Sequence, residues 1–302
     1  MAISRAQLAK ELEPGLNALF GLEFGRYENE HGEIYEEESS DRAFEEEVML
    51  GGFSTAPVKS EGGAISFDDA QETYTARYTH ETIALAFSIT EEAIEDNLYD
   101  RLASRYTKAL ARSMAQTKQI KAASILNNAF STGVNVIGDG AALCSAAHPS
   151  LSGNQTNLLA TAADLNETSL EQMLIDVAGF TDERGLKVAV RGMKLIIPKE
   201  LQFIAERVLN SNLRSGTADN DNNAMKNMGM LPEGAVVNHF LTDTDAFFIK
   251  TDAPNGFKYF NRSSIKTAME GDFDTGNMRF KARERYSFGV SDWRCVFGTP
   301  GA

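Results

Sequence analysis

The residues Asp274, Thr275 and Gly276 spell the active-site triplet of aspartic proteases. That reaction needs two carboxylates that share one proton, and therefore two such triplets or a symmetric dimer. The chain holds a single copy, and no apolar strand leads into it. Because Asp and Gly both favour turns, we interpret the segment as a turn between two strands rather than as a catalytic site.

A calcium-loop motif is present only in part. Asp219, Asp221 and Asn223 match the first three ligand positions of an EF-hand loop. Ala224 stands where that loop requires Gly, however, and Met230 stands where it requires Glu. The match fails at the positions that the ion needs most, so no calcium site is predicted.

A cysteine and a histidine are also spaced for metal binding. Cys144 and His148 could share a zinc ion, but two ligands do not make a site and no second pair follows them. A structural role is therefore favoured. The chain has no G-x-G-x-x-G, Walker, H-E-x-x-H or G-x-S-x-G motif. The sequence thus predicts no catalytic residue, no metal and no cofactor, and an enzyme with an unrecognised site is kept as an alternative.

The overall charge and hydropathy exclude several classes of protein. The formal net charge of -14 at pH 7 argues against a dedicated nucleic-acid binder, which needs a basic footprint, but not against a protein that encloses nucleic acid. No window holds the roughly 20 apolar residues of a membrane helix. The first residues lack the apolar core of a secretory signal. We therefore expect synthesis inside a cell, no membrane, and free thiols at Cys144 and Cys295.

Residues 27–47, YENEHGEIYEEESSDRAFEEE, hold ten acidic side chains and one arginine. Most charge runs are solvated tails. This one is interleaved with Ile34, Tyr35 and Phe44, which a solvated tail would not need. An arm that packs on a neighbouring subunit is therefore favoured over a tail. The glutamates predicted to lie at that interface are Glu36, Glu37, Glu38, Glu45, Glu46 and Glu47.

Two predicted elements are longer than a compact domain of this size requires. Residues 73–89 alternate with a period of two, which predicts one strand of about 17 residues, roughly 55 Å at about 3.3 Å per residue. Residues 91–130 contain no Gly or Pro and follow a suitable N-cap, which predicts a helix of about 60 Å. Before the strand, residues 48–69 are rich in glycine and small residues, which is typical of a hairpin tip.

Basic side chains gather on two predicted faces, one on the long helix and one on an alternating strand near the C-terminus. Both faces are predicted subunit interfaces, because few of the predicted parts can bury their surfaces within one subunit. For the strand face, contact with nucleic acid is the alternative that the sequence leaves open. The helix stripe consists of Arg101, Arg105, Lys108 and Arg112, and the strand face consists of Arg279, Lys281, Arg283 and Arg285.

The order of these parts resembles the major capsid proteins of tailed bacteriophages, which have the Hong Kong 97-type fold, and within them the Mu-like major head subunits. Three stretches carry the resemblance: ITEEAIEDNLYDRLASRYTKALARSMAQTKQIKAASILNNAF, DGAALCSAAHPSLSG and FKARERYSFGVSDWRCVFG. The resemblance covers nearly the whole chain, and its motifs are structural rather than catalytic.

The resemblance implies an α+β protein with the parts of a Hong Kong 97-type subunit. Residues 1–45 would form an N-terminal arm, and residues 46–88 an extended β-hairpin loop that lies over the adjacent subunit. Residues 89–159 and 255–302 would form a peripheral domain with a long spine helix. Residues 160–254 would form an axial domain near the centre of each capsomer.

The resemblance also implies a structural function. Such subunits form pentamers and hexamers that close into an icosahedral shell around double-stranded DNA, as part of the virion, after assembly in the host bacterial cytoplasm. A portal is expected, and a separate scaffolding protein is favoured because only about 45 residues precede the loop; a decoration protein is a further candidate partner. Lys59 is the candidate lysine for covalent cross-linking, but no Asn partner is identified, so cross-linking is not predicted. An encapsulin-like compartment, which encloses protein cargo, shares the fold and is kept as an alternative.

Overall fold

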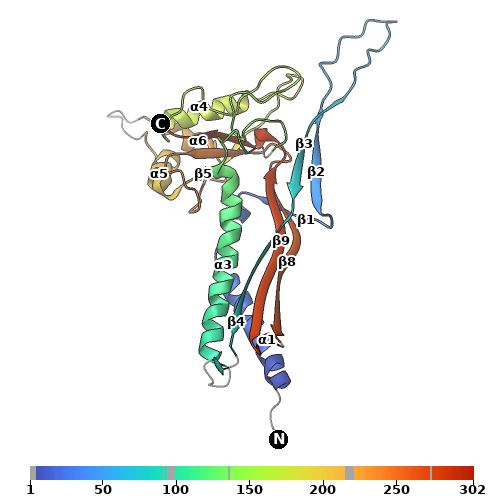
Figure 1. Ribbon diagram of the computed structural model, residues 1–302. Helices are drawn as coiled ribbons and strands as arrows, with labels where there is room; N and C mark the ends of the chain where they lie inside the picture. Colours follow the sequence, from blue (N-terminus) through green and yellow to red (C-terminus); the bar gives the residue numbers. More distant parts are fainter. Residues whose placement is uncertain (1–4, 91, 94–98, 135–136, 215–220, 273) are drawn as a thin grey trace.

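The computed structural model describes residues 5–90, 92–93, 99–134, 137–214, 221–272 and 274–302. These residues form an elongated lower body, a compact upper body and a long hairpin that projects away from both (Figure 1). The presence of both helices and β-sheets confirms the predicted α+β class. The helices are α1 (Arg5–Phe24), α3 (Tyr99–Asn127), α4 (Glu167–Ala178), α5 (Gln202–Asn210) and α6 (Ala224–Met228), with 3-10 turns η1 (Glu30–Glu33), η2 (Lys199–Leu201) and η3 (Trp293–Cys295).

The lower body is a four-stranded sheet with helices on one face. Its strand order is β1-β8-β9-β4, formed by β1 (Glu36–Ser39), β8 (Phe257–Gly271), β9 (Met278–Val290) and β4 (Glu81–Ile89). Strands β8 and β9 form an antiparallel hairpin, and β1 joins β8 in parallel. Helices α1 and α3 cover the face that carries Phe280, which packs in one cluster with Leu110, Met114 and Phe20. Burial of this cluster holds the two helices on the sheet.

Helix α1 holds a proline and a glycine in its interior. Pro and Gly are the residues least favoured inside a helix, yet Pro14 and Gly15 both lie within this helix of 20 residues. Tertiary packing outweighs the local preference against them. Leu16 and Phe20, in the following turns, are buried, and the rings of Phe20 and Phe280 lie 6.5 Å apart.

The single long strand predicted for residues 73–89 is divided in two. Strand β3 (Gln71–Thr79) pairs with β2 (Phe44–Gly51) in the projecting hairpin, whereas β4 pairs with β9 in the sheet of the lower body. The break falls at His80, which is buried between the two strands. The period of two continues through the break, so the pattern predicts extended backbone but not the change of partner.

Helix α3 is the longest helix in the structure and confirms a long helix in this region. It ends at Asn127, three residues before the predicted end at position 130. The predicted start falls on residues 91 and 94–98, which lie outside the described residues. Its inner face meets β4, β9 and α1.

The upper body is built around a second four-stranded sheet, in the order β10-β7-β5-β6. Its strands are β5 (Gly192–Ile197), β6 (Ala235–Val237), β7 (Phe247–Thr251) and β10 (Val296–Thr299). Ile196, Phe247 and Phe297 lie in its core, together with Met173 of α4. Strand β10 pairs with β7, so one sheet joins the predicted ranges 255–302 and 160–254. The domain boundaries stay predictions.

The projecting hairpin consists of β2, β3 and a tip of residues 52–70 without helix or strand (Figure 1). Its two strands pair antiparallel from Phe44 and Thr79 at the base to Gly51 and Gln71 at the tip. A two-stranded hairpin of this kind is marginal in water on its own. Contacts at its base must therefore fix its direction.

Candidate functional site

The protease-like triplet and the partial calcium-loop motif both have structural roles. Residues 274 and 275 form a turn between β8 and β9, and the Thr275 hydroxyl donates to the Asp272 carboxylate at 2.8 Å. Asp219 lies outside the described residues. Asn223 caps α6, because its side-chain oxygen accepts from the backbone N–H of Met225 at 3.0 Å. Each of these described side chains supports local backbone structure.

His148 lies in a hydrogen-bond network whose side chains are fully buried. Its Nδ1 is 2.6 Å from Asp139 Oδ2, and its Nε2 is 3.0 Å from Asn157 Oδ1. The imidazole stacks on the indole of Trp293, with ring centroids 4.6 Å apart. Burial raises the pKa of the nearby Cys144 thiol, so the thiolate is disfavoured. Among the described residues no three His, Cys, Asp or Glu side chains are grouped for a metal ion.

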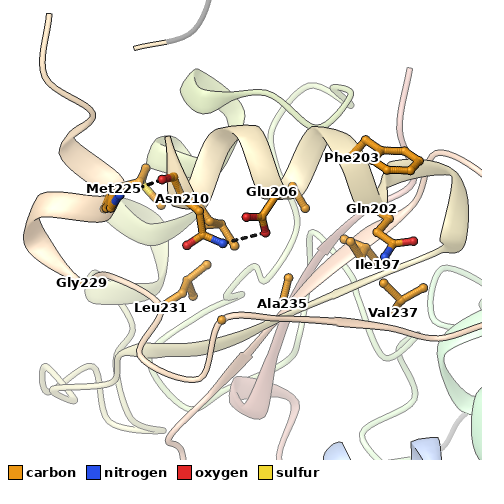
Figure 2. Close-up of a pocket in the computed structure, with 14 residues that line it drawn as sticks. Ile197, Gln202, Phe203, Glu206, Asn210, Met225, Gly229, Leu231, Ala235 and Val237 are labelled. Atoms are coloured by element: carbon orange, nitrogen blue, oxygen red, sulfur yellow. Dashed lines mark hydrogen bonds between the residues drawn. The ribbon is translucent and has the colours of Figure 1, made fainter. Parts of the chain in front are cut away.

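A cavity of about 480 Å³ lies between α5 and β6 (Figure 2). The carboxylate of Glu206 accepts from the Asn210 amide at 2.7 Å, one helical turn along α5. Lys226, also in the lining, donates to the Asn210 carbonyl at 2.8 Å. The first of these bonds lies within α5, and the second joins α6 to α5.

The acidic run is folded and largely paired within its own chain. It forms η1, β1 and β2, so the solvated-tail alternative is wrong. Its partners come from both bodies and from the hairpin itself rather than from either predicted basic face. The contacts join Glu30 to His239 (2.8 Å), Glu33 to Lys194 (2.8 Å), Glu38 to Lys258 (3.1 Å), Glu46 to Arg77 (3.6 Å), and Glu47 to Lys258.

The lysines that form ion pairs with these glutamates were not predicted from the sequence. Lys194 and Lys258 are buried, and each stands among apolar residues in a strand, in MKLII and FKYF. Burial alone lowers the pKa of Lys258, but its bonds to Glu47 and Glu38 outweigh burial and raise that pKa. A lone lysine in an otherwise core-facing strand is the signal that predicts such a buried acidic partner.

The strand face predicted near the C-terminus is confirmed as one face of β9. Arg279, Lys281 and Arg283 are exposed, while the residues between them are buried. The neighbouring positions on β4 are small: Ala84 pairs with Arg283, and Ala86 with Lys281. We call Arg279, Lys281, Arg283 and Arg285 the basic ladder. It faces away from α3, because the alternate side chains of β9 face the helices.

The helix stripe is exposed where the structure describes it. Arg105, Lys108 and Arg112 point to solvent from α3, and the side chain of Arg101 lies outside the described residues. Within the described part of the chain these three side chains have no ion-pair partner. Of the basic ladder, Arg279 pairs with Asp272 at 2.5 Å. Neither face meets the acidic run within one chain, so the interface residues stay predictions.

The hairpin tip carries the most exposed apolar side chains of the described chain. Val58 is fully exposed, and Phe67 is 95% exposed. Ile65 and Phe53 lie in the same tip and are also exposed. Lys59 is exposed beside them. Apolar side chains gathered on a projecting element mark an interaction surface.

The fold is that of a capsid subunit. A chain of Mycobacterium phage Adephagia matches with a TM-score of 0.55 at 12% identity, covering 91% of each chain. The capsid of Myoviridae phage XM1 matches with a TM-score of 0.51 at 13% identity, covering 90% of each. The virus-like particle from Pyrococcus furiosus matches with a TM-score of 0.50 at 9% identity, covering 94% of this chain and 97% of that one.

A match to a sequence profile identifies the protein family. The profile of the phage capsid protein family matches residues 73–298, so the chain belongs to that family. A search of curated protein sequences returns no match. The chain is therefore a structural major capsid protein of a bacteriophage head, as the sequence resemblance predicted. Among the described residues, no helix has the length and apolar character to cross a membrane.

Proposed function

We propose that this chain is a Mu-like major head subunit that assembles through pentamers and hexamers into a closed icosahedral shell around double-stranded DNA. The observation that carries the proposal is the projecting hairpin with Val58 and Phe67 exposed at its tip. Exposed apolar groups on a marginal hairpin need a partner surface to be stable. A neighbouring subunit supplies that surface in the proposed shell. The role is structural, and no catalysis is part of it.

The charged faces support the same arrangement. The tip carries Glu61, Asp68 and Asp69, and the basic ladder of β9 offers cations beside the small residues Ala84 and Ala86 of β4. Opposite charges on two surfaces of one chain favour contact between copies and fix their register. We assign the basic ladder and the helix stripe as contacts to neighbouring subunits. A portal, a separate scaffolding protein and a decoration protein are further proposed partners, with assembly in the bacterial cytoplasm.

The experiment compares particles formed by the wild-type chain and by the V58D/F67D double variant. Both are expressed with the phage's scaffolding protein and examined by size-exclusion chromatography and negative-stain microscopy. The wild type is expected to form closed shells, and the variant is expected to stop at capsomers or smaller species. The matched control is I175D, because Ile175 is exposed on α4 in the upper body. Normal shells from V58D/F67D would overturn the role of the hairpin, and a discrete wild-type dimer would overturn the shell.

A second candidate is a compartment that encloses protein cargo. The match to the Pyrococcus furiosus virus-like particle over nearly the whole of both chains supports it. Nuclease treatment of purified particles separates the two functions. Protected double-stranded DNA supports the phage head, and co-purified protein without nucleic acid supports the compartment.

A further inference from the structure

The hairpin is joined to the lower body by two chain crossings, and one histidine contacts both. Ser40 lies where the chain passes from β1 to β2, and His80 lies where it passes from β3 to β4. The His80 Nε2 is 2.9 Å from the Ser40 hydroxyl, and its Nδ1 is 2.9 Å from the hydroxyl of Ser287 on β9. The imidazole therefore ties the base of the hairpin to the central hairpin of the sheet.

The hydrogen bonds around Ser40 fix the tautomer of His80. The Ser40 hydroxyl donates its one hydrogen to Glu45 Oε1 at 2.7 Å and accepts from the Arg42 N–H at 3.2 Å. The only remaining role for Ser40 toward the imidazole is as an acceptor, so His80 Nε2 carries the hydrogen. Nδ1 is then an acceptor and takes the hydrogen of Ser287. The four side chains of Ser287, His80, Ser40 and Glu45 form a directed series that requires a neutral imidazole, and we call them the latch.

Protonation of His80 would break this series at one defined bond. A hydrogen on Nδ1 removes the acceptor that Ser287 uses, and the ring becomes a cation. The facing groups are Arg285 on β9, Arg262 on β8 and Glu45 on β2. Burial, followed by Arg285, holds the pKa of His80 below its ordinary value, with Glu45 acting in the opposite direction.

Other nearby charges are already paired. Asp41, which follows β1, lies 3.9 Å from Arg262. Glu81 on β4 pairs with Lys121 of α3. A second anchor holds the inner face of the hairpin through the contacts of Lys258 with Glu47, and that anchor lacks a histidine.

We infer that His80 is a pH-sensitive latch: the neutral imidazole fixes the direction of the β2–β3 hairpin, and its protonation lets the hairpin turn about the second anchor. This inference rests on the contacts at the hairpin base and not on the proposed function. The sign follows from linkage. Latching favours the neutral ring, so the latch is fully effective above the ordinary pKa of 6.5 and weakens as the pH falls below it.

Pulsed electron paramagnetic resonance measures the hairpin direction directly. Nitroxide labels are placed on V58C in the tip and A109C on α3, both exposed positions, and labelled chain is diluted with excess unlabelled chain. The native Cys144 and Cys295 are buried and serve as the unlabelled background. Between pH 8 and pH 5.5, the ratio of released to latched hairpin is expected to rise by up to about tenfold, the linkage limit for one such group. A distance distribution that does not change with pH overturns the latch.

Two variants, H80Q and the control H239Q, test whether His80 is the responsible group. H80Q supplies an amide oxygen for Ser287 and an amide N–H for Ser40 without titrating, so it is expected to keep the pH 8 distribution at both pH values. H239Q removes a histidine that is exposed and bonded to Glu30, and it is expected to respond as the wild type does. A wild-type response in H80Q overturns the inference.

The S287A variant keeps the inference falsifiable if H80Q does not fold. Loss of the Ser287 hydroxyl removes the one bond that protonation breaks, so the released fraction is expected to be higher at pH 8 and to change less between pH 8 and pH 5.5 than in the wild type. Circular dichroism confirms that each variant is folded before labelling. A pH response in S287A as large as that of the wild type would overturn the latch independently of H80Q.

Discussion

The ion pair between Lys118 and Glu284 connects α3 to the sheet of the lower body. The loss of unfolding free energy on its removal can be worked out from the structure. Lys118 Nζ lies 2.7 Å from Glu284 Oε2, and the two side chains are 13% and 1% exposed. Burial raises the pKa of Glu284, with Lys118 acting against burial. The substitution K118M keeps the length and apolar stem of the side chain and removes only the cation.

Protonation of Glu284 limits the cost of K118M. At pH 7, protonation of a glutamate whose ordinary pKa is 4.5 costs about 3.4 kcal/mol, at 1.36 kcal/mol per pH unit. Because burial already raises this pKa in the wild type, the expected loss of unfolding free energy is about 2–3 kcal/mol. At pH 5 the same protonation costs about 0.7 kcal/mol, so the loss should fall below about 1 kcal/mol. The variant therefore gains stability relative to the wild type as the pH falls.

Urea unfolding of the unassembled chain, followed by far-ultraviolet circular dichroism, measures these differences. The matched control is K121M on the same helix, because Lys121 and its partner Glu81 are 42% and 59% exposed. Such an exposed pair should contribute less than about 1 kcal/mol. A loss in K118M that is below about 1 kcal/mol at pH 7, or equal at pH 5 and pH 7, would refute the reasoning.

Two further predictions concern the upper body. Asn157 Nδ2 donates to the carbonyl oxygens of Leu143, Trp293 and Val296 at 2.8–3.1 Å. The N157A variant should therefore lower the unfolding free energy by about 3 kcal/mol or more in urea titrations. As a control, N154A at an exposed position should change it by less than about 0.5 kcal/mol. The buried Cys144 and Cys295 thiols, whose pKa values burial raises, should react with an aromatic disulfide reagent only after denaturation; rapid reaction of either thiol in the native chain would contradict the structure.

The sequence predicted the long elements because their periods are imposed by burial on one face. The alternation from Met278 to Arg285 appears in the structure as the solvent-facing and buried faces of β9. The break at His80 could not be predicted, since the alternation persists while the pairing partner changes from β2 to β9. The interior position of Pro14 depends on the contacts of Leu16 and Phe20, which no local pattern contains.

The charged surfaces were predicted less completely than the elements. The basic faces were identified from spacing, because a helix or strand determines which side chains share a face. The partners of the acidic run were not identified, since Glu38 and Lys258 meet only through the parallel pairing of β1 with β8. Pairing between distant strands depends on topology rather than on local sequence.

The parallel pairing of β1 with β8 also orders events during synthesis. Glu36 and its partner Lys258 lie more than two hundred residues apart, and His80 reaches Ser287 over a similar span. A ribosome-bound chain cannot close either contact until almost all of it has been translated. The base of the hairpin is therefore among the last regions to become ordered. A nascent chain therefore cannot hold its hairpin in the final direction until translation is nearly complete.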